Sequence, residues 1–393
     1  MIRKLSIFLL CALCSFTAGC GPRAGTNKPL MIFQKELLDL AFEAAADIPI
    51  KPHIKSRSRV QEQIVGACLE LGQPELAKEY IPQIKNWRRG TAHADLGFYY
   101  ARNGAVEKAR EQFEIAEEIA LVIDGWQKGR IRAHAARGYA YLGQKEQAAR
   151  LTQNSLKGVE SGKVNRAAAM VCDDTAYDEQ VKALKKVLEN RRFDVRQQAL
   201  IAATELFNTF YEQEDKRIFL EEMIWESWGN LSPSMQIDLL AGMAEYALAH
   251  NDSAKAGELL EDAGARFEKA HWKPEFRIPI MARLAWLWFH AGNNEKAKEM
   301  TTSAEAVYDD IANIYRVEAL CLIAGAYQKM GQTEEALRIY ARAFEENIEN
   351  PNSRTRAEGL ALICRSMALR AVEPTPELWA RIRQINAELG NPW

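Results

Sequence analysis

The sequence predicts an all-α protein whose helices form one solenoid of about nine helical hairpins. A glycine followed five residues later by an alanine recurs along the 393-residue chain, which indicates a repeated structural unit. Long stretches rich in Ala, Glu, Leu and Arg favour helix. No segment alternates apolar and polar residues between hairpin turns, and 13 Pro with 23 Gly are few for an all-β protein of this size. A sheet is therefore not expected.

The glycine of each unit marks the turn between its two helices. Glycine readily adopts the left-handed conformation that ends a helix, which costs other residues about 1 kcal/mol. The small alanine in the next helix lets the two helices approach closely. In five units an acid follows the glycine by three residues, where it interacts favourably with the helix dipole. The turn residues, their alanines and the acids are Gly72/Ala77/Glu75, Gly104/Ala109/Glu107, Gly143/Ala148/Glu146, Gly292/Ala297/Glu295 and Gly331/Ala336/Glu334, with Asn251/Ala256 as a variant.

Three of these units resemble the tetratricopeptide repeat (TPR) at a set of fixed spacings. The best copy is Leu96-Gly97, Tyr100, Gly104, Ala109, Phe113 and Ala116; the second is Ile323-Ala324, Tyr327, Gly331, Ala336, Tyr340 and Ala343; the third is Leu284-Ala285, Trp288, Gly292, Ala297 and Ala304. The resemblance implies a right-handed superhelix in which the first helix of each hairpin lines a concave groove. Each hairpin then buries its apolar face only against its neighbours.

The remaining elements follow from turn residues and helix signals. An opening helix is expected over residues 31–47, closed off by Pro49 and Pro52. Residues 106–123 read as one continuous helix. The long interval between the turns at Gly143 and Asn251 has room for two weaker units. Their helices, and those of the final pair, are expected at residues 181–188, 195–211, 217–225, 357–369 and 376–389.

The first 20 residues are arranged like a secretory signal peptide. Residues 1–4 are basic, residues 5–16 are apolar, and Thr17-Ala18-Gly19 places small residues before Cys20. The apolar run is too short for a permanent transmembrane helix. The Thr-Ala-Gly-Cys ending resembles a bacterial lipobox, in which the cysteine is acylated, commonly with palmitate among its chains, and becomes the mature N-terminus.

The signal resemblance implies both domain boundaries and a location. Residues 1–19 are expected to be a lipoprotein-type signal peptide, residues 20–30 a flexible tether, and residues 31–393 a single TPR-like repeat domain. Lipid on Cys20 would anchor the chain to a membrane. The residue after it, Gly21, is not aspartate, which in lipoproteins of the enteric type implies the outer membrane, with the domain facing the periplasm. If Cys20 is not lipidated, the alternative is a secreted protein.

Charge and cysteine usage narrow the classes of partner. With 51 Lys+Arg and 53 Asp+Glu, 51 − 53 gives a net charge of −2, which argues against a nucleic-acid-binding protein. After the signal segment the cysteines are Cys68, Cys172, Cys321 and Cys364, apart from Cys20, and no two form a CxxC pair. Three of these four lie in apolar helical patterns, so buried thiols are expected rather than a disulfide framework.

No catalytic, metal or cofactor constellation is expected. The six histidines lack the three-to-five-residue spacing of a metal pair, although His93 and His134 lie on first helices of successive units and could approach each other. Cys172-Asp173-Asp174 is the one compact polar cluster, and helix capping by the aspartates explains it. Glu221 and Glu222 are adjacent on a helix and point in different directions, so they cannot bracket one glycosidic bond together.

The most informative candidates are positions in the groove of the solenoid. In TPR proteins the concave surface is lined by residues of the first helices at fixed offsets from the Leu-Gly pair. Aromatic and arginine side chains are enriched among the residues that dominate protein-binding energies. Trp288 replaces the packing aromatic and is expected in the core. The resemblance places ten residues in the groove: Phe98, Arg102, Arg130, Arg137, Tyr141, Trp286, Phe289, His290, Gln328 and Lys329.

The leading hypothesis is a non-enzymatic scaffold or adaptor that binds a protein or peptide segment in this groove while tethered to the membrane. Two alternatives remain open. One is a polysaccharide-active enzyme, which would need the helical array to close on itself around a pocket holding two carboxylates about 5–10 Å apart. The other is a self-associating structural envelope protein, a homo-oligomer built by stacking of solenoid ends.

Overall fold

The computed structural model describes residues 27–152, 159–229 and 231–390, and within them the chain is all-α. These residues form 19 α-helices and two short 3₁₀ helices, with no strand. This confirms the predicted helical solenoid. The signal peptide at 1–19, Cys20 and the greater part of the predicted tether lie outside the described residues.

The opening helix α1 (Ile32–Asp47) is followed by nine hairpins. Their first helices are α2 (Ile50–Glu70), α4 (Arg88–Arg102), α6 (Trp126–Tyr141), α8 (Val159–Ala169), α10 (Phe193–Thr209), α12 (Pro233–Ala249), α14 (Pro274–His290), α16 (Asn313–Lys329) and α18 (Ser353–Arg370). Their second helices are α3 (Pro74–Tyr80), α5 (Val106–Leu121), α7 (Lys145–Thr152), α9 (Tyr177–Leu188), α11 (Glu214–Ser227), α13 (Ser253–Lys269), α15 (Asn294–Ala306), α17 (Thr333–Ile348) and α19 (Pro376–Ala387).

The turn chemistry is as predicted. The five turn glycines have φ between +72° and +88°, and Asn251 has φ +62°. All six alanines that follow them are buried, each with at most 5% of its surface exposed. The five acids lie in the first turns of their helices. In the last hairpin Ala371 occupies the left-handed turn position, with φ +51°. The α8–α9 and α10–α11 hairpins have no residue with positive φ in their turns.

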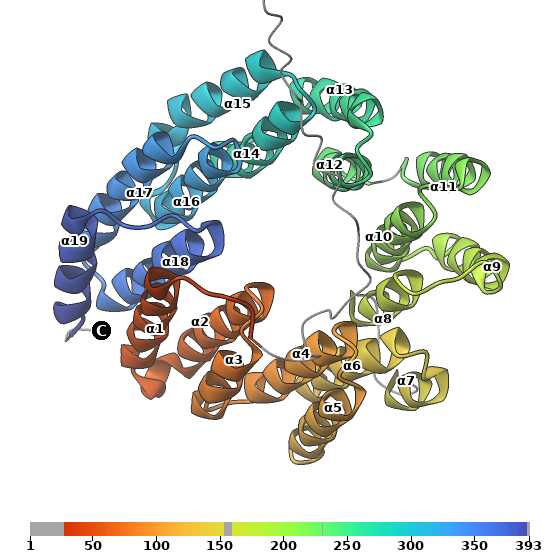
Figure 1. Ribbon diagram of the computed structural model, residues 1–393, viewed down its shortest axis with the longest axis horizontal. Helices are drawn as coiled ribbons and strands as arrows, with labels where there is room; N and C mark the ends of the chain where they lie inside the picture. The colour runs from red at the N-terminus through yellow and green to blue at the C-terminus, as the bar shows by residue number, and fades with distance from the viewer. Residues whose placement is uncertain (1–26, 153–158, 230, 391–393) are drawn as a thin grey trace, which may run out of the picture.

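The hairpins are arranged as a closed ring (Figure 1). The first helices contact one another in sequence from α2 to α18 and form the inner wall, while the second helices lie outside. Helix α1 packs along α18, and α2 also contacts α18, so the two ends of the solenoid meet. The groove predicted from the TPR resemblance is therefore the inner face of a ring. The handedness of the superhelix stays a prediction.

Polar contacts accompany this closure. The buried side chain of Gln34 on α1 donates from Nε2 to the carbonyl oxygen of Ala368 on α18, at 2.8 Å. Arg59 on α2 pairs with Glu358 on α18 at 3.2 Å. Because these contacts join residues about 300 positions apart in sequence, they depend on the curvature accumulated over all the hairpins.

Close packing between neighbouring hairpins depends on small residues. The ring of Phe113 on α5 is inserted between Gly97 of α4 and Gly138 of α6. A Cβ at Gly138 would lie 2.0 Å from Cζ of Phe113, and a Cβ at Gly97 would lie 2.5 Å from Cε1 of the same ring. Glycine is therefore needed at these two positions because a side chain would overlap the Phe113 ring, and not because the chain turns there.

The first residues that the structure describes contact the turn between α2 and α3. The Lys28 backbone N–H donates to the Gly72 carbonyl at 2.9 Å, and Gln73 Nε2 donates to the Lys28 carbonyl at 2.7 Å. The last residues of the predicted tether thus lie on the body of the ring. None of the described helices combines the length and apolarity that crossing a membrane requires.

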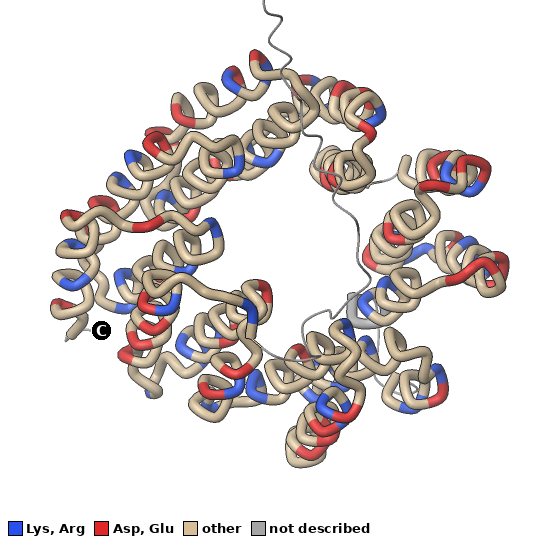
Figure 2. Tube along the Cα trace, viewed as in Figure 1, with Lys and Arg blue, Asp and Glu red and all other residues tan. Residues whose placement is uncertain are grey.

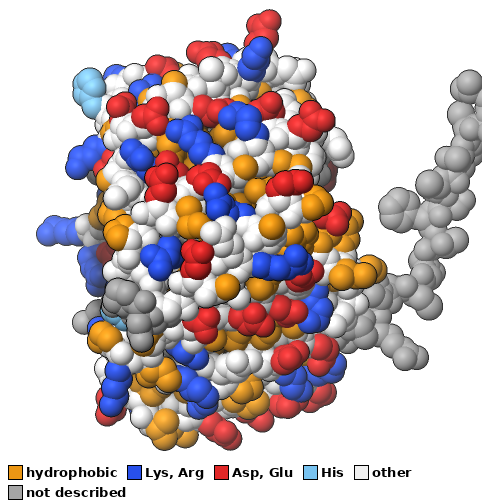
Figure 3. Space-filling view, turned by 90° about the vertical axis from the view of Figure 1, so that its left-hand side faces the viewer, with side chains coloured by type: hydrophobic (Ala, Val, Ile, Leu, Met, Phe, Trp, Pro, Cys, Tyr) orange, Lys and Arg blue, Asp and Glu red, His pale blue; other side chains and the backbone are white. Residues whose placement is uncertain are grey.

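The outside of the ring carries acidic and basic side chains side by side. Figure 3 shows them intermingled with small apolar areas on the side that carries α17 and α19. Along the whole backbone, charged residues of both signs occur in most helices (Figure 2). A mixed surface of this kind agrees with the small net charge of −2.

Gly138→Ala is expected to destabilise the fold by about 1–3 kcal/mol, because the added methyl group must displace Phe113 from a close-packed site. The measurement is the free energy of unfolding in denaturant. Gly264→Ala is the matched control, since Gly264 lies inside α13 with no atom within 4 Å of a new Cβ. That change should stabilise the helix by about 0.5–1 kcal/mol. Equal effects of the two variants would contradict the inserted ring.

Gln34→Ala is expected to cost about 1–2 kcal/mol, because it removes the buried hydrogen bond to α18 and the acceptor of the Met31 backbone N–H. Hydrogen exchange should become faster in both α1 and α18. Glu43→Ala on the exposed face of α1 serves as control and should change stability by less than about 0.5 kcal/mol. Faster exchange in α1 alone would show that the ring does not depend on this contact for closure.

Candidate functional site

Charged hydrogen bonds connect neighbouring helices of the inner wall. Each joins an acid on one helix to a base on the next, and together they run round much of the ring. The pairs are Glu62 (α2) with Arg88 (α4), Asp95 (α4) with Arg137 (α6), Arg166 (α8) with Glu205 (α10), Glu245 (α12) with Arg283 (α14), and Glu358 (α18) with Arg59 (α2). Most of the inner charge is thus neutralised locally.

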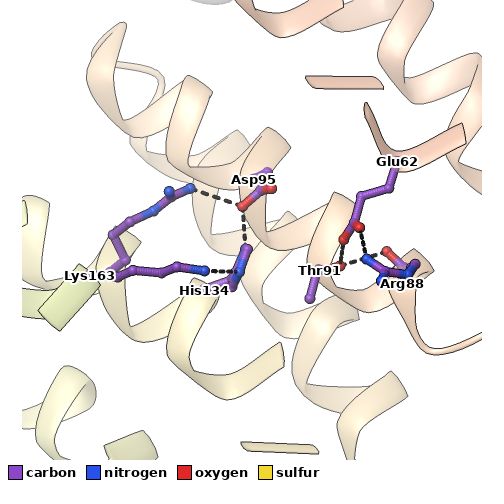
Figure 4. A network of polar contacts seen from close by, with 7 residues as sticks. Glu62, Arg88, Thr91, Asp95, His134 and Lys163 are labelled. Carbon is purple, nitrogen blue, oxygen red and sulfur yellow. Dashed lines mark hydrogen bonds and ion pairs between the residues drawn. The ribbon is translucent and has the colours of Figure 1, made fainter. Parts of the chain in front are cut away.

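The network around Asp95 is the most extensive of these (Figure 4). Asp95 Oδ1 lies 2.6 Å from His134 Nδ1 and 2.9 Å from Arg137 Nη2, and His134 Nε2 lies 2.8 Å from Lys163 Nζ. Since an ammonium can only donate, His134 accepts at Nε2 and donates from Nδ1–H to the carboxylate. Both ring nitrogens are therefore occupied, and His134 holds α4, α6 and α8 together.

Burial alone would raise the pKa of Asp95, but the attraction of His134 and Arg137 outweighs it and lowers the pKa to about 2. The carboxylate is therefore ionised at any physiological pH. This arrangement stabilises the wall and leaves no free base for proton abstraction.

Four of the predicted groove residues form one cluster on α4 and α6. The Arg137 guanidinium lies 4.0 Å from the centre of the Phe98 ring, and Arg102 lies 5.9 Å from it. Phe98 and Tyr141 meet edge to face with ring centres 5.5 Å apart. Arg130 lies apart from this cluster, with its guanidinium 5.7 Å from the ring of Trp87. The cationic groups here are already stacked on aromatic rings, and Arg137 is bonded to Asp95.

The other predicted residues gather on α14 and α16. Lys329 Nζ lies 3.4 Å from the centre of the Trp286 ring, and His290 Nε2 donates to the Lys329 carbonyl at 3.0 Å. Phe289 contacts His290 but lines a different pocket, one enclosed with α15 and α17. The Gln328 Oε1 atom is buried without a hydrogen-bond partner among the described residues. Trp288 is 3% exposed, which confirms the prediction that it belongs to the core.

A pocket of about 350 Å³ lies on the inner wall where α12, α14, α16 and α18 meet, and it is called the inner pocket below. Trp286 and Lys329 line it. Its apolar lining residues include Leu322, Leu362 and Leu369. The basic residues are Lys329, Arg283, Arg365 and Arg370, and the acidic ones are Glu245 and Glu318.

The basic groups of the inner pocket disfavour one another's charge. Burial and the positive charge of Arg370 lower the pKa of Lys329 to about 8, against smaller opposing effects of Glu245 and Glu70. Burial also lowers the pKa of Arg365. Within the described part of the chain, none of Lys329, Arg365 and Arg370 lies within 4 Å of a carboxylate, whereas Arg283 contacts both Glu245 and Asp238. The pocket therefore holds cations that no carboxylate of the described residues contacts.

Sequence reasoning missed Arg365 and Arg370. The unit to which they belong has no turn glycine, so the offsets that identified Trp286 and Lys329 could not be carried onto α18. Pro376, at the start of α19, was a usable marker of the same turn. Arg283 was missed although it immediately precedes the Leu284-Ala285 pair, because its neighbours Glu245 and Asp238 come from the preceding hairpin.

The histidines do not form a metal site among the described residues, where no group of three potential ligands gathers. His93 and His134, which could have approached each other, have different partners. His93 Nδ1 lies 2.9 Å from Gln112 Oε1, and burial, partly offset by that hydrogen bond, lowers the pKa of His93.

The cysteines and the acidic clusters have structural roles. Cys68, Cys321 and Cys364 are buried free thiols, as predicted, and Cys172 is half-buried. Asp173 accepts hydrogen bonds from the backbone N–H groups of Thr175 and Ala176 and so closes the turn before α9. The predicted capping is wrong, because no side chain caps α9 and Asp174 pairs instead with Lys216. The adjacent acids on α11 face different ways: Glu221 pairs with Lys255 at 2.6 Å, and Glu222 is exposed.

Asp95→Asn is expected to lower the free energy of unfolding at pH 7 by about 1.5–3 kcal/mol, because a neutral amide binds His134 and Arg137 less strongly. The pKa of Asp95 is depressed in the folded state, so its contribution is present above about pH 4 and is lost as the pH falls towards 2. Unfolding free energies of wild type and variant should therefore converge between pH 4 and 2. A difference that is independent of pH would contradict the charged network.

A scan against protein-family models finds no match to this chain, and a search of the curated proteins finds none either. The function must therefore be inferred from the residues and their geometry.

Proposed function

We propose that the protein is a non-enzymatic scaffold or adaptor that binds a protein or peptide segment on the inner face of its ring. Lipid on Cys20 tethers it to the outer membrane, with the ring in the periplasm. The observation that carries the proposal is the inner pocket, where Trp286 and Lys329 lie beside cations without a contacting carboxylate. Tryptophan and arginine are the residue types that most often anchor protein partners.

The rest of the inner wall supports the choice of this pocket. Its charged groups on α2 to α8 are engaged with one another, as the Asp95 network shows (Figure 4). Exchanging such hydrogen bonds for contacts with a ligand gains little free energy, because the groups must first lose their present partners. Cations that lack a contacting acid gain more free energy from binding a partner, because they lose no existing ion pair.

The place where the described chain begins sets the distance to the membrane. Lys28 is bonded to the turn at Gly72, and six residues lie between Cys20 and Asn27, so that seven residue-to-residue steps join the two. Fully extended, they reach about 25 Å. A lipidated protein would hold its ring close to the bilayer, with the α2–α3 turn on the near side, and its partner would have to reach the ring there.

Trp286→Ala is expected to reduce crosslinking of the partner to the ring by about tenfold or more, as loss of an aromatic anchor does. The measurement is crosslinking in intact cells followed by quantitative mass spectrometry. Phe289→Ala is the matched control, because Phe289 lies on the same helix but lines another pocket. Equal losses for both variants, or no loss for either, would count against the inner pocket. Mass spectrometry of the mature N-terminus tests the lipid on Cys20.

A second candidate is a polysaccharide-active enzyme, and one observation favours it. Asp238 and Glu245 on α12 both contact the guanidinium of Arg283, at 3.3 and 2.9 Å, and both line one pocket on the inner wall. Desolvation by the surrounding walls raises the pKa of Asp238, although its side chain remains 66% exposed. Two carboxyl groups on the wall of one pocket are what glycoside hydrolysis requires.

Glu245→Gln separates this candidate from the scaffold. An enzyme of this type should lose at least about a hundredfold in the release of reducing ends from polysaccharides, because it loses one of its two carboxylates. Under the leading proposal wild type has no such activity, so the substitution has none to remove. Hydrolysis by wild type that the substitution abolishes would replace the scaffold proposal.

A further inference from the structure

The inner pocket departs from the pattern that holds elsewhere on the wall. Around α2 to α14, bases on one helix contact acids on the next. Lys329, Arg365 and Arg370 converge on one pocket from α16 and α18 without such a contact in the described chain. Like charges gathered in a partly desolvated space repel each other, so the arrangement reduces stability unless an anion enters.

The geometry of the pocket holds these cations in place. A Cβ at Gly325 on α16 would lie 3.4 Å from Nε of Arg370, so the arginine of α18 lies directly over a residue without a side chain. Lys329 is held against the face of Trp286, an arrangement that favours the charged amine. Two guanidinium groups beside an ammonium can bind a carboxylate through several donors at once.

The acids nearest the pocket do not contact Lys329, Arg365 or Arg370. Glu245 is engaged by Arg283, while Glu318 lines the pocket near Arg365. Glu70 on α2 acts on Lys329 and Arg365 only through space. Four bases and two acids among the lining residues give an excess of 4 − 2 = 2 positive charges. Two acids outside the lining oppose this excess: Asp238 contacts Arg283, and Glu70 acts through space.

We propose that the inner pocket binds acidic side chains of the peptide segment taken up by the ring, with Lys329, Arg365 and Arg370 as the carboxylate-binding residues. The inference rests on the proposed function and specifies the chemistry of its partner. The lining also includes the apolar side chains of Leu322, Leu362 and Leu369, so a segment in which acidic residues alternate with apolar ones fits it best. Contacts with each carboxylate should weaken as ionic strength rises.

The test uses the mature ring domain with a fluorescent nonapeptide in which three Glu alternate with Leu, and the same peptide with Gln in place of Glu. Anisotropy measures both affinities. The Glu peptide should bind at least about tenfold more tightly than the Gln peptide, and the difference should shrink with added salt. Lys329→Gln/Arg370→Gln should abolish the difference, while Lys329→Arg should retain most of it.

The matched control is Lys269→Gln/Lys298→Gln, which removes two exposed lysines outside the pocket. It lowers the net charge equally and should leave the preference for Glu unchanged. If the control loses the preference as the pocket variant does, long-range charge and not the pocket is responsible, and the proposal is overturned. Thermal unfolding checks that each variant is folded, and removing mutually repelling charges should not destabilise the pocket.

A second readout reports on the pocket itself. In reductively ¹³C-methylated protein, the signal that disappears in Lys329→Arg should titrate near pH 8. The Glu peptide should shift that titration to higher pH, because a bound carboxylate stabilises the ammonium. Inorganic phosphate, tested in parallel, should have a much weaker effect; a stronger effect of phosphate would overturn the assignment to acidic peptides.

The outcomes distinguish the two proposals. Equal binding of the Glu and Gln peptides, with both weakened by Trp286→Ala, would overturn the acidic preference and leave the scaffold proposal standing. Absence of binding by either peptide, together with an unchanged Lys329 signal and no partner in crosslinking, would overturn both.

Discussion

The close approach of neighbouring helices is the constraint on which the rest of the structure depends. A left-handed turn residue reverses the chain, and an alanine or glycine at the crossing lets the second helix nest against the first. At α4 to α6 the requirement is strictest, since Phe113 occupies the space that Gly97 and Gly138 leave free. Because the inner wall consists only of the first helices, this nesting also determines which residues face the interior.

Because the ring is closed, its inner wall differs from the groove of an open solenoid. An open solenoid would offer a groove with two free ends, whereas here α1 and α2 contact α18 and the wall is continuous (Figure 1). The closure brings Glu70 of the first hairpin within electrostatic range of Lys329 and Arg365 near the end of the chain. The electrostatic environment of the inner pocket thus combines residues from both ends of the sequence.

The inner wall has two regions. In one, charged side chains of opposite sign are paired and stabilise the ring, and in the other, cations lack a contacting carboxylate. In the first, carboxylates and bases are bonded across helix boundaries, and the depressed pKa of Asp95 measures how strongly it is held. In the second, the lowered pKa of Lys329 reports a cation that the fold keeps at some cost in stability. Such costs are common at functional sites, where groups are arranged for a ligand and not for the folded state alone. The inner pocket is the clearest example in this chain.

The sequence by itself determined the local structure: turn residues, alanines and first-turn acids predicted the helical hairpins, because left-handed turns and close helix contacts each admit few residue types. It also identified Trp286 and Lys329, whose positions follow from offsets within a well-matched repeat. Only the tertiary structure decided that the ends meet and that Arg365 and Arg370 join them in one pocket. Closure depends on small rotations added over nine hairpins, and no local pattern encodes their sum. The pairing of charges between hairpins escaped prediction for the same reason, since partners such as Asp95 and His134 are 39 residues apart.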